Sequence, residues 1–282
     1  MYEKKDWVLY PSKTFLLSKA SIDMERFLLN VKNDSLAFII LVSLILGLIY
    51  SFTKLGKPNS TANFLKTDSI PALIIAGLGI PALIDLIKVG GFATFFSVVQ
   101  LIILLFVIVN AACAIVNTNF RAKSSKWIKQ LFVLLILGGF FTAGYLAYVE
   151  ILAQPAICGV EYSGCTTVQT SRYALLLGFM PVALLGVLGY LAILVVWLAR
   201  HSQINNRFPS IAYFQWGLVL FGVIFSTYLT YLEVFVIHAT CSWCITSAVI
   251  MNLLLHISTL DLNVYLQAKE IELEEQSEIF ED

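Results

Sequence analysis

Two pairs of cysteines are the residues of this chain whose type and spacing suit them best to chemistry. Cys241 and Cys244 are separated by two residues where a long apolar run begins. At the start of a helix such a pair can close a small disulfide ring, and the helix N-terminus favours the thiolate form. Cys158 and Cys165 form a second pair, with two glycines between them that make the loop flexible. Because disulfides exchange by thiolate attack, a mobile pair beside a fixed pair predicts a thiol–disulfide relay.

The position of each helical thiol predicts its part in such a relay. Cys241 is nearer to solvent and is expected to exchange with the loop pair, whereas Cys244 lies deeper and faces the membrane interior. The electrons would then leave toward an acceptor that dissolves in the membrane. Two other interpretations use the same residues, because four thiolates can bind a structural zinc ion and two pairs can form permanent disulfides. The fifth cysteine, Cys113, lies within an apolar run and is interpreted as a packing residue.

The composition is that of a membrane protein. Of the 282 residues, 59% are apolar and 13% are charged, and the mean hydropathy is +0.85. Several nearly uncharged runs reach about 18 residues, the length that crosses roughly 30 Å of hydrocarbon. These values exclude a water-soluble globular fold, and the formal net charge of +0 gives no support to nucleic-acid binding. The predicted fold class is therefore an all-α integral membrane protein with several spans.

A cluster of cations sets the orientation of the predicted spans. Residues 117–129 contain four Lys or Arg and no acid, which places this segment in the cytoplasm by the positive-inside rule. Alternation then predicts spans at 128–151, 173–198, 211–237 and 244–260. The loop at 152–172 and the turn before Cys241 consequently face the extracytoplasmic side, where disulfides can be made and kept.

The N-terminal part contains predicted spans at 36–52 and 92–116, with a less regular segment at 70–87 between them. Two prolines and an acid make that segment a poor uniform helix. More Lys and Arg lie in the cytoplasm if it does not cross, so six full spans and a re-entrant or interfacial segment are expected. The start of the chain lacks the compact apolar core of a cleavable signal peptide. The expected division is 1–35 as a cytoplasmic segment, 36–120 as an additional transmembrane region, 121–260 as a four-helix unit and 261–282 as an acidic cytoplasmic tail.

Four sequence blocks, in order, resemble the vitamin K epoxide reductase family over about residues 128–260. The first block holds the loop cysteines Cys158 and Cys165, followed by Ser171-Arg172-Tyr173. The others are Gly-Phe-Met-Pro-Val-Ala at 178–183, Tyr-Leu-Thr-Tyr-Leu-Glu at 228–233 and Cys-Ser-Trp-Cys-Ile-Thr-Ser-Ala at 241–248. Residues 1–121 are outside the resemblance.

The resemblance implies a four-helix bundle of the vitamin K epoxide reductase type that encloses a quinone pocket, here with extra N-terminal transmembrane helices. In bacterial members the loop pair reoxidises a thioredoxin-fold thiol oxidase outside the cytoplasm. Electrons then pass through the helical pair to ubiquinone or menaquinone. By position, Cys158 and Cys165 are implied to be the shuttle. Cys241 would exchange with one of them, Cys244 would react with the quinone, and Ser171 would place a hydroxyl near the quinone ring.

The resemblance also implies a location and a partner. Bacterial members lie in the inner (plasma) membrane as multi-pass proteins, with the cysteines facing the periplasmic or extracytoplasmic side. Many of them carry a fused thioredoxin-like domain, whereas here the partner is expected to be a separate protein. Ser242 stands where many bacterial members have proline, a change expected to shift the redox potential. Ala248 stands where the animal enzymes have a tyrosine implicated in vitamin K binding, which argues against epoxide reduction.

Three further polar features are candidates. Glu233 lies within a span, where a charge is costly, so it is functional by default unless it snorkels or hydrogen-bonds another helix. His238, three residues before Cys241, could assist proton transfer, but a histidine at the headgroup level without a catalytic role is favoured. Asp85 and Lys88 are interpreted as marking where the segment at 70–87 meets the interface.

Overall fold

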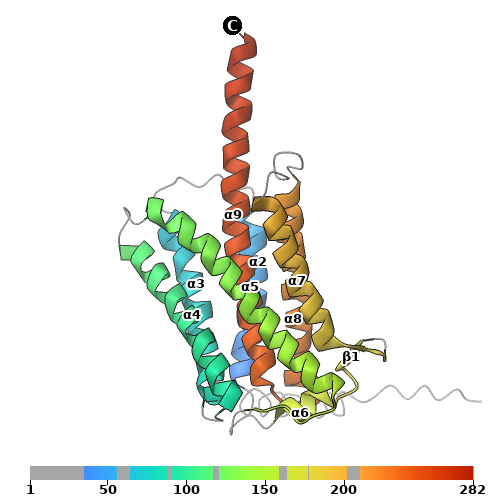
Figure 1. Ribbon diagram of the computed structural model, residues 1–282. Coiled ribbons are helices and arrows are strands. Elements are labelled where there is room, and N and C mark those ends of the chain that lie inside the picture. The colour runs from blue at the N-terminus through green and yellow to red at the C-terminus, as the bar shows by residue number, and fades with distance from the viewer. Residues whose placement is uncertain are drawn as a thin grey trace, which may run out of the picture.

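The computed structural model describes residues 35–55, 64–87, 91–116, 121–158, 164–176, 178–201 and 210–281. Within these ranges seven long helices form one bundle (Figure 1). They are α2 (Ser35–Lys54), α3 (Phe64–Ile87), α4 (Gly91–Val116), α5 (Arg121–Ile151), α7 (Val182–His201), α8 (Ile211–Leu232) and α9 (Ser242–Glu281). Shorter elements are α6 (Gly164–Gln169), the π-helical turn η3 (Glu233–Ile237) and an antiparallel hairpin of β1 (Leu175–Leu176) and β2 (Met180–Pro181).

The helices follow from long apolar runs, because a chain in lipid must satisfy its backbone hydrogen bonds within each segment. Five of the described helices are long and apolar enough to cross a membrane, namely Ser35–Lys54, Ile128–Ile151, Val182–His201, Ile211–Ile237 and Ser242–Glu274. The described parts of α3 and α4 contain shorter apolar stretches, Ile70–Ile84 and Thr94–Val109. The predicted all-α integral membrane fold is confirmed.

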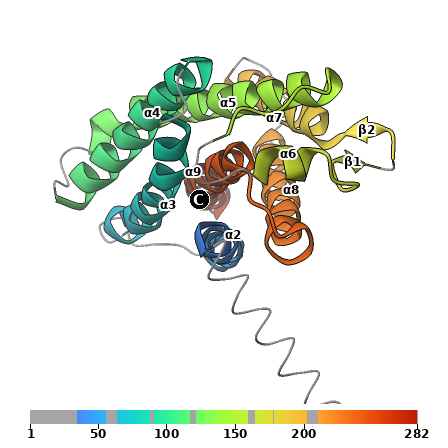
Figure 2. The same ribbon diagram turned by 90° about the horizontal axis from the view of Figure 1, so that it is seen from below.

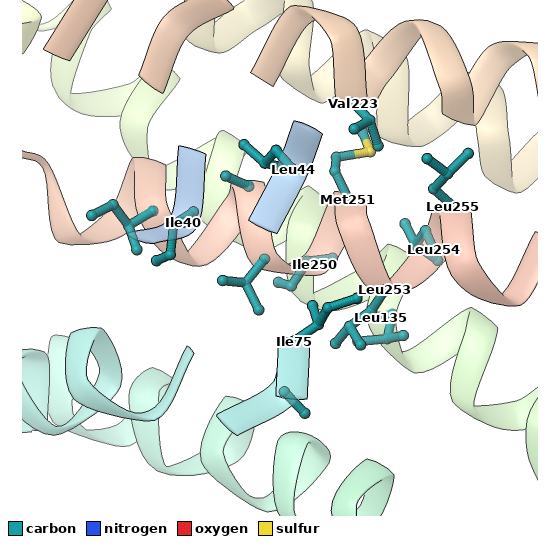
Figure 3. Packing of buried hydrophobic residues seen from close by; sticks show 14 of the residues in the cluster. Ile40, Leu44, Ile75, Leu135, Val223, Ile250, Met251, Leu253, Leu254 and Leu255 are labelled. Carbon is teal, nitrogen blue, oxygen red and sulfur yellow. The ribbon is translucent and has the colours of Figure 1, made fainter. Parts of the chain in front are cut away.

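α9 is the central helix of the bundle. In the view along the bundle it is surrounded by α2, α3, α5 and α8, and it contacts all four (Figure 2). The main apolar core gathers around its middle turns, where Ile250, Met251 and Leu253 to Leu255 are buried (Figure 3). The surrounding helices contribute Ile40 and Leu44 from α2, Ile75 from α3, Leu135 from α5 and Val223 from α8. α9, which begins at the helical cysteine pair, is therefore held by packing against four surrounding helices.

α2 runs parallel to α9 along a line of polar contacts. Asn252 Nδ2 donates to the carbonyl and hydroxyl oxygens of Ser43, at 3.1 Å each. Two turns further on, the hydroxyls of Ser51 and Thr259 are hydrogen-bonded at 2.8 Å. Because the pairs advance together, Ser35 starts at the cysteine face of the bundle. Residues 1–34 lie outside the described residues. Ser35 and the tail are at opposite faces, although the sequence analysis expected both in the cytoplasm.

α3 runs antiparallel to α9 and ends at the cysteine face. Leu86, in its last turn, is buried in the same apolar cluster as Trp243. Thr94 of α4 donates its hydroxyl to the carbonyl of Ile87 at 2.8 Å, so α4 starts at that face. Residues 70–87 belong to a continuous 24-residue helix about 36 Å long, whose apolar stretch Ile70–Ile84 is shorter than the five candidate spans; a re-entrant or interfacial course stays a prediction.

Packing explains why this segment is a helix in spite of its composition. Pro71 and Pro81 lie inside α3 and each removes a backbone donor. The close approach of α3 to both neighbours compensates, since a Cβ on Gly79 would lie 2.8 Å from Leu104 of α4 and 3.0 Å from Val249 of α9. Tertiary contacts of this kind allow proline in a membrane helix.

α9 continues past the predicted boundary at residue 260 without a break. Its 40 residues span about 60 Å, so its acidic end extends beyond the bundle (Figure 1). At the boundary Arg200 of α7 forms an ion pair with Asp261. The predicted tail is therefore the helical continuation of α9 as far as Glu281.

Candidate functional site

The helical cysteine pair lies at the entry to α9. Cys241 directly precedes the helix, and its carbonyl accepts the Ile245 N–H at 3.0 Å. The side chain of Cys241 is buried and that of Cys244 is half-buried, and the two thiols are not joined in a disulfide. Trp243 between them is fully buried. The pair therefore sits at the N-terminal end of the most enclosed helix, where free N–H groups stabilise negative charge.

Local hydrogen bonds favour the thiolate of Cys241. Burial by itself raises the pKa of this thiol, since charge is disfavoured away from water. Hydrogen bonds from the Cys244 thiol and from the backbone N–H groups of Cys244 and Trp243 outweigh burial and lower the pKa of Cys241 below the ordinary value of a cysteine. Cys241 is therefore equipped to act as the attacking thiolate in exchange.

The π-helical turn η3 brings a carboxylate against the pair. Glu233 begins this turn and is 2% exposed. One of its carboxylate oxygens accepts the Cys241 N–H at 3.5 Å, and its side chain is hydrogen-bonded to the Cys244 thiol. His238 ends the turn with φ of 55°, and both its N–H and that of Ala239 donate to the Glu233 carbonyl. This backbone reversal carries the chain from α8 to Cys241.

The loop cysteines form a disulfide in the structure. Cys158 and Cys165 are joined, with their Cα atoms 6.1 Å apart. Cys165 is fully buried at the start of α6, whereas Cys158 is half-buried. The five residues between Cys158 and Gly164 lie outside the described residues. The two cysteines of this pair thus differ in their access to solvent.

A glycine seats the loop against the α9 entry. A Cβ on Gly164 would lie 2.7 Å from both the N and the O atoms of Thr240, a distance that real Cβ atoms do not adopt. Only glycine therefore allows this approach between the residue before Cys165 and the residue before Cys241. Gly164 thus provides a close backbone contact, whereas flexibility was the role predicted for the loop glycines.

Two aromatic residues hold the other side of the loop. The Ile157 N–H donates to Tyr145 Oη at 2.9 Å, and Trp243 Nε1 donates to the Ile157 carbonyl at 2.8 Å. The Tyr145 and Trp243 rings contact each other, with centroids 4.7 Å apart. Because Ile157 directly precedes Cys158, these hydrogen bonds fix the position of Cys158 relative to the helical pair. Tyr145 is not among the site residues predicted from the sequence; the signal that points to it is Trp243, which lies between the two helical cysteines and contacts its ring.

All four cysteines belong to one apolar cluster. Its buried members include Cys165, Cys241 and Trp243, and Cys158 and Cys244 pack against it. Two buried members come from the N-terminal helices: Leu86 of α3, and Phe96 of α4, whose ring centroid is 5.7 Å from that of Trp243. The helices before residue 121, which lie outside the family resemblance, therefore form part of the wall around the thiols.

A cavity of about 390 Å³ opens beside Cys244, among α5, α7, α8 and α9. Its lining is mainly apolar and includes Ser171 and Glu233. The Ser171 hydroxyl donates to the Val168 carbonyl at 2.7 Å. Two polar atoms of lining residues, Glu150 Oε1 and Gln169 Nε2, are buried without a hydrogen-bond partner. Buried polar atoms are normally paired, so the cavity wall offers unmet hydrogen bonds to a ligand.

Other candidates lie away from the thiols or outside the described part. His256 is buried in α9 with its ring 5.1 Å from that of Tyr50, and His201 stacks on Trp197 with centroids 4.2 Å apart. The side chains of Cys113 and Asp85, and the whole of Lys88, lie outside the described residues. Among the described side chains no three His, Cys, Asp or Glu residues are grouped as a metal ion requires.

Comparison with known families gives one result for this region. The model of the vitamin K epoxide reductase family matches residues 130–259. This range contains the loop cysteines, Ser171, Glu233 and the helical pair, and it begins within α5 and ends within α9. No solved structure matches the chain.

Proposed function

Over residues 130–259 this chain belongs to the vitamin K epoxide reductase family, and we propose from this membership that it is a membrane thiol–disulfide oxidoreductase of the quinone-dependent type. In this function it reoxidises an extracytoplasmic thioredoxin-fold protein and passes the electrons through two cysteine pairs to a membrane quinone. Its role in the cell is to support disulfide bond formation.

The observation that carries the proposal is the position of the helical pair between two different environments. On one side the loop disulfide is seated against the α9 entry by Gly164, in the same cluster as Cys241. On the other side Cys244 lines the apolar cavity. A soluble protein can reach the loop but not the cavity, and a lipid-soluble acceptor has the opposite access. The two pairs therefore connect two reactants that need not meet.

Burial supports an order of exchange within the relay. Cys158 is the more exposed loop cysteine, so the thiolate of the reduced partner attacks it and the Cys158–Cys165 disulfide breaks. Cys165, buried beside the helical pair, then attacks Cys241 when Cys241 and Cys244 are joined as a disulfide. Each exchange forms one S–S bond and breaks another, so two electrons move inward per cycle. The attack by Cys165 forms a Cys165–Cys241 mixed disulfide and releases Cys244. Cys158 then attacks Cys165 and expels Cys241, which its lowered pKa makes a good leaving thiolate.

The residues of the cavity fit a quinone as the acceptor. A quinone takes two electrons and two protons when it is reduced to the hydroquinone. Its ring and isoprenoid chain suit an apolar cavity of about 390 Å³ within the bundle. Gln169 Nε2 could donate to a ring oxygen of the quinone, and Glu150 Oε1 and the Ser171 oxygen could each accept a hydrogen bond from a hydroxyl of the hydroquinone. Cys244 is the thiol that faces this space.

The proposed orientation puts the cysteine face outside the cytoplasm, in a bacterial plasma membrane. The start of α5, with the cations of residues 121–129, and the end of α7 with Arg200 belong to the opposite face, which agrees with the positive-inside rule. The start of α2 then also lies at the extracytoplasmic face. This orientation puts the loop disulfide in a compartment where disulfides persist.

The test is quinone reduction by the purified full-length protein with a reduced thioredoxin-fold donor. We expect Cys244→Ala to abolish reduction with every donor, and Cys158→Ala to abolish it with the protein donor but not with a small dithiol. Cys113→Ala serves as the matched cysteine control and should retain activity. Reduction that is indifferent to Cys244→Ala and Cys158→Ala would show that the cysteines are structural, as would bound zinc in an inactive wild type.

A further inference from the structure

We propose that Glu233 is the proton carrier of the helical dithiol, accepting the Cys244 proton and delivering it to the acceptor in the cavity. This inference rests on the proposed function. It assigns to the π-helical turn a role in the chemical step that is separate from the exchange of disulfides.

Position is the first observation. Glu233 is hydrogen-bonded to the Cys244 thiol and accepts the Cys241 N–H, and it also lines the cavity. One carboxylate thus contacts both residues of the pair and the space where the acceptor would bind. A proton carrier must lie within hydrogen-bond reach of the group that releases the proton, and Glu233 meets this condition.

The second observation is the energetic cost of burying the Glu233 carboxylate. A carboxylate that is 2% exposed within a membrane span is energetically expensive and marks a function in most membrane proteins. The turn that contains it is π-helical, a rare form that often occurs at functional sites. Its closing residue, His238, has a φ of 55°, in the left-handed region that few non-glycine residues adopt, histidine more often than most. The backbone therefore departs from regular helix where it presents this carboxylate.

The step balances in electrons and protons. As the S–S bond forms between the Cys241 thiolate and the Cys244 thiol, the pair loses two electrons and one proton. The quinone gains the two electrons, the Cys244 proton by way of Glu233, and a second proton from water. The proton on Cys244 has Glu233 as a direct acceptor inside the bundle. Glu233 returns to its carboxylate form when it passes this proton into the cavity.

Other titratable groups share the surroundings and must be considered in any test. Around Glu233 and along the cavity wall they are Cys241 and Cys244 at the start of α9, Glu150 of α5, Tyr173 before α7, Tyr190 of α7, and His238 at the end of η3. Of these, the Cys244 thiol is hydrogen-bonded to the Glu233 side chain, whereas Cys241 meets it through its backbone N–H. A direct proton exchange is therefore expected between Cys244 and Glu233.

The experiment compares Glu233→Gln with wild type, because glutamine keeps the size and can still accept the Cys241 N–H. We expect single-turnover reduction of a short-chain quinone by the prereduced protein to slow by about 100-fold, as general acid–base catalysis of this kind contributes. Glu233→Asp, which retains a carboxyl, should recover part of the rate. Glu272→Gln, the same change on the exposed end of α9, is the matched control and should not differ from wild type.

A second readout needs no quinone. In Cys158→Ala/Cys165→Ala protein, the equilibrium between the Cys241–Cys244 disulfide and dithiothreitol is followed against pH. If Glu233 and Cys244 exchange a proton, their titrations are coupled, and the wild-type profile contains an inflection that Glu233→Gln loses. A slower rate with an unchanged profile would overturn the proposal, since it would indicate a structural role. A changed profile with an unchanged rate would overturn it as well.

The same data separate this inference from the proposed function. A wild type that reduces quinone while Glu233→Gln matches it in rate and profile overturns the role of Glu233 and leaves the function intact. A wild type that reduces no quinone overturns the proposed function. In that case a pH profile altered by Glu233→Gln would still support proton exchange between Glu233 and Cys244. Thermal unfolding of each variant establishes that the comparison is made on folded protein.

Discussion

The thiol of Cys241 shows how neighbouring groups set the reactivity of a single residue. Its hydrogen bonds lower its pKa, so in the folded state the thiolate persists to lower pH than in the unfolded chain. The stability that these bonds supply is present above the unfolded pKa of about 8.5 and is lost as pH falls through the folded pKa. We expect thiolate absorbance of the reduced protein to show a midpoint below that value, absent in Cys241→Ser. A midpoint at or above the ordinary value would contradict the structure.

Because Gly164 has no side chain, α6 can pack directly against the entry of α9, which brings the loop cysteines to the helical cysteines. Gly164→Ala places a Cβ 2.7 Å from the Thr240 backbone, so α6 must move away from the α9 entry. We expect the exchange between the loop dithiol and the Cys241–Cys244 disulfide to slow by about 10-fold or more, measured by rapid mixing and thiol trapping. Reaction of the helical pair with a small dithiol should persist. Gly144→Ala, with nothing within 4 Å of its Cβ, is the control; equal effects of both changes would refute this role.

At the scale of elements, the contact between α2 and α9 depends on a polar stripe of α9, formed by Asn252, His256, Thr259 and Asn263. The Thr259 hydroxyl bonds to Ser51 at 2.8 Å and accepts Trp216 Nε1–H at 3.2 Å, joining three helices. We expect Thr259→Val to lower the free energy of unfolding by about 1 kcal/mol, in mixed-micelle denaturation. Thr227→Val removes a hydroxyl bonded to its own helix and should cost less. The reverse order would show that the stripe contributes little.

At the scale of the whole molecule, the number of crossings decides which face each terminus meets. Ser35 starts α2 at the cysteine face, whereas Ser210 and Gln276 belong to the opposite face. In a cysteine-free background we expect a membrane-impermeant maleimide to label Ser35→Cys from outside intact cells, and Ser210→Cys and Gln276→Cys only after lysis. All three positions are exposed, so access depends on the side of the membrane. If the maleimide labels none of the three positions until the cells are lysed, the result would instead support a segment at 70–87 that does not cross the membrane.

The sequence by itself determined the class of the protein and its candidate site residues. Apolar runs are local and long, so composition alone requires helices that cross a membrane. The spacing of Cys241 and Cys244 at a helix start, and the blocks around Cys158 and Cys165, likewise identify the family without any knowledge of packing. These signals lie within a few residues of one another along the chain, which is why they can be recognised in the sequence.

Only the tertiary structure decided how the N-terminal third and the buried polar groups take part. Propensity counts Pro71 and Pro81 against a helix, but residues 64–87 form a continuous helix that packs between α4 and α9. Three contacts around the thiols join residues from different elements: Gly164 with Thr240, Phe96 with Trp243, and Glu233 with Cys244. No periodicity encodes such contacts, since they depend on the relative placement of whole helices. Long-range packing thus decided the surroundings of thiols that the sequence had already identified.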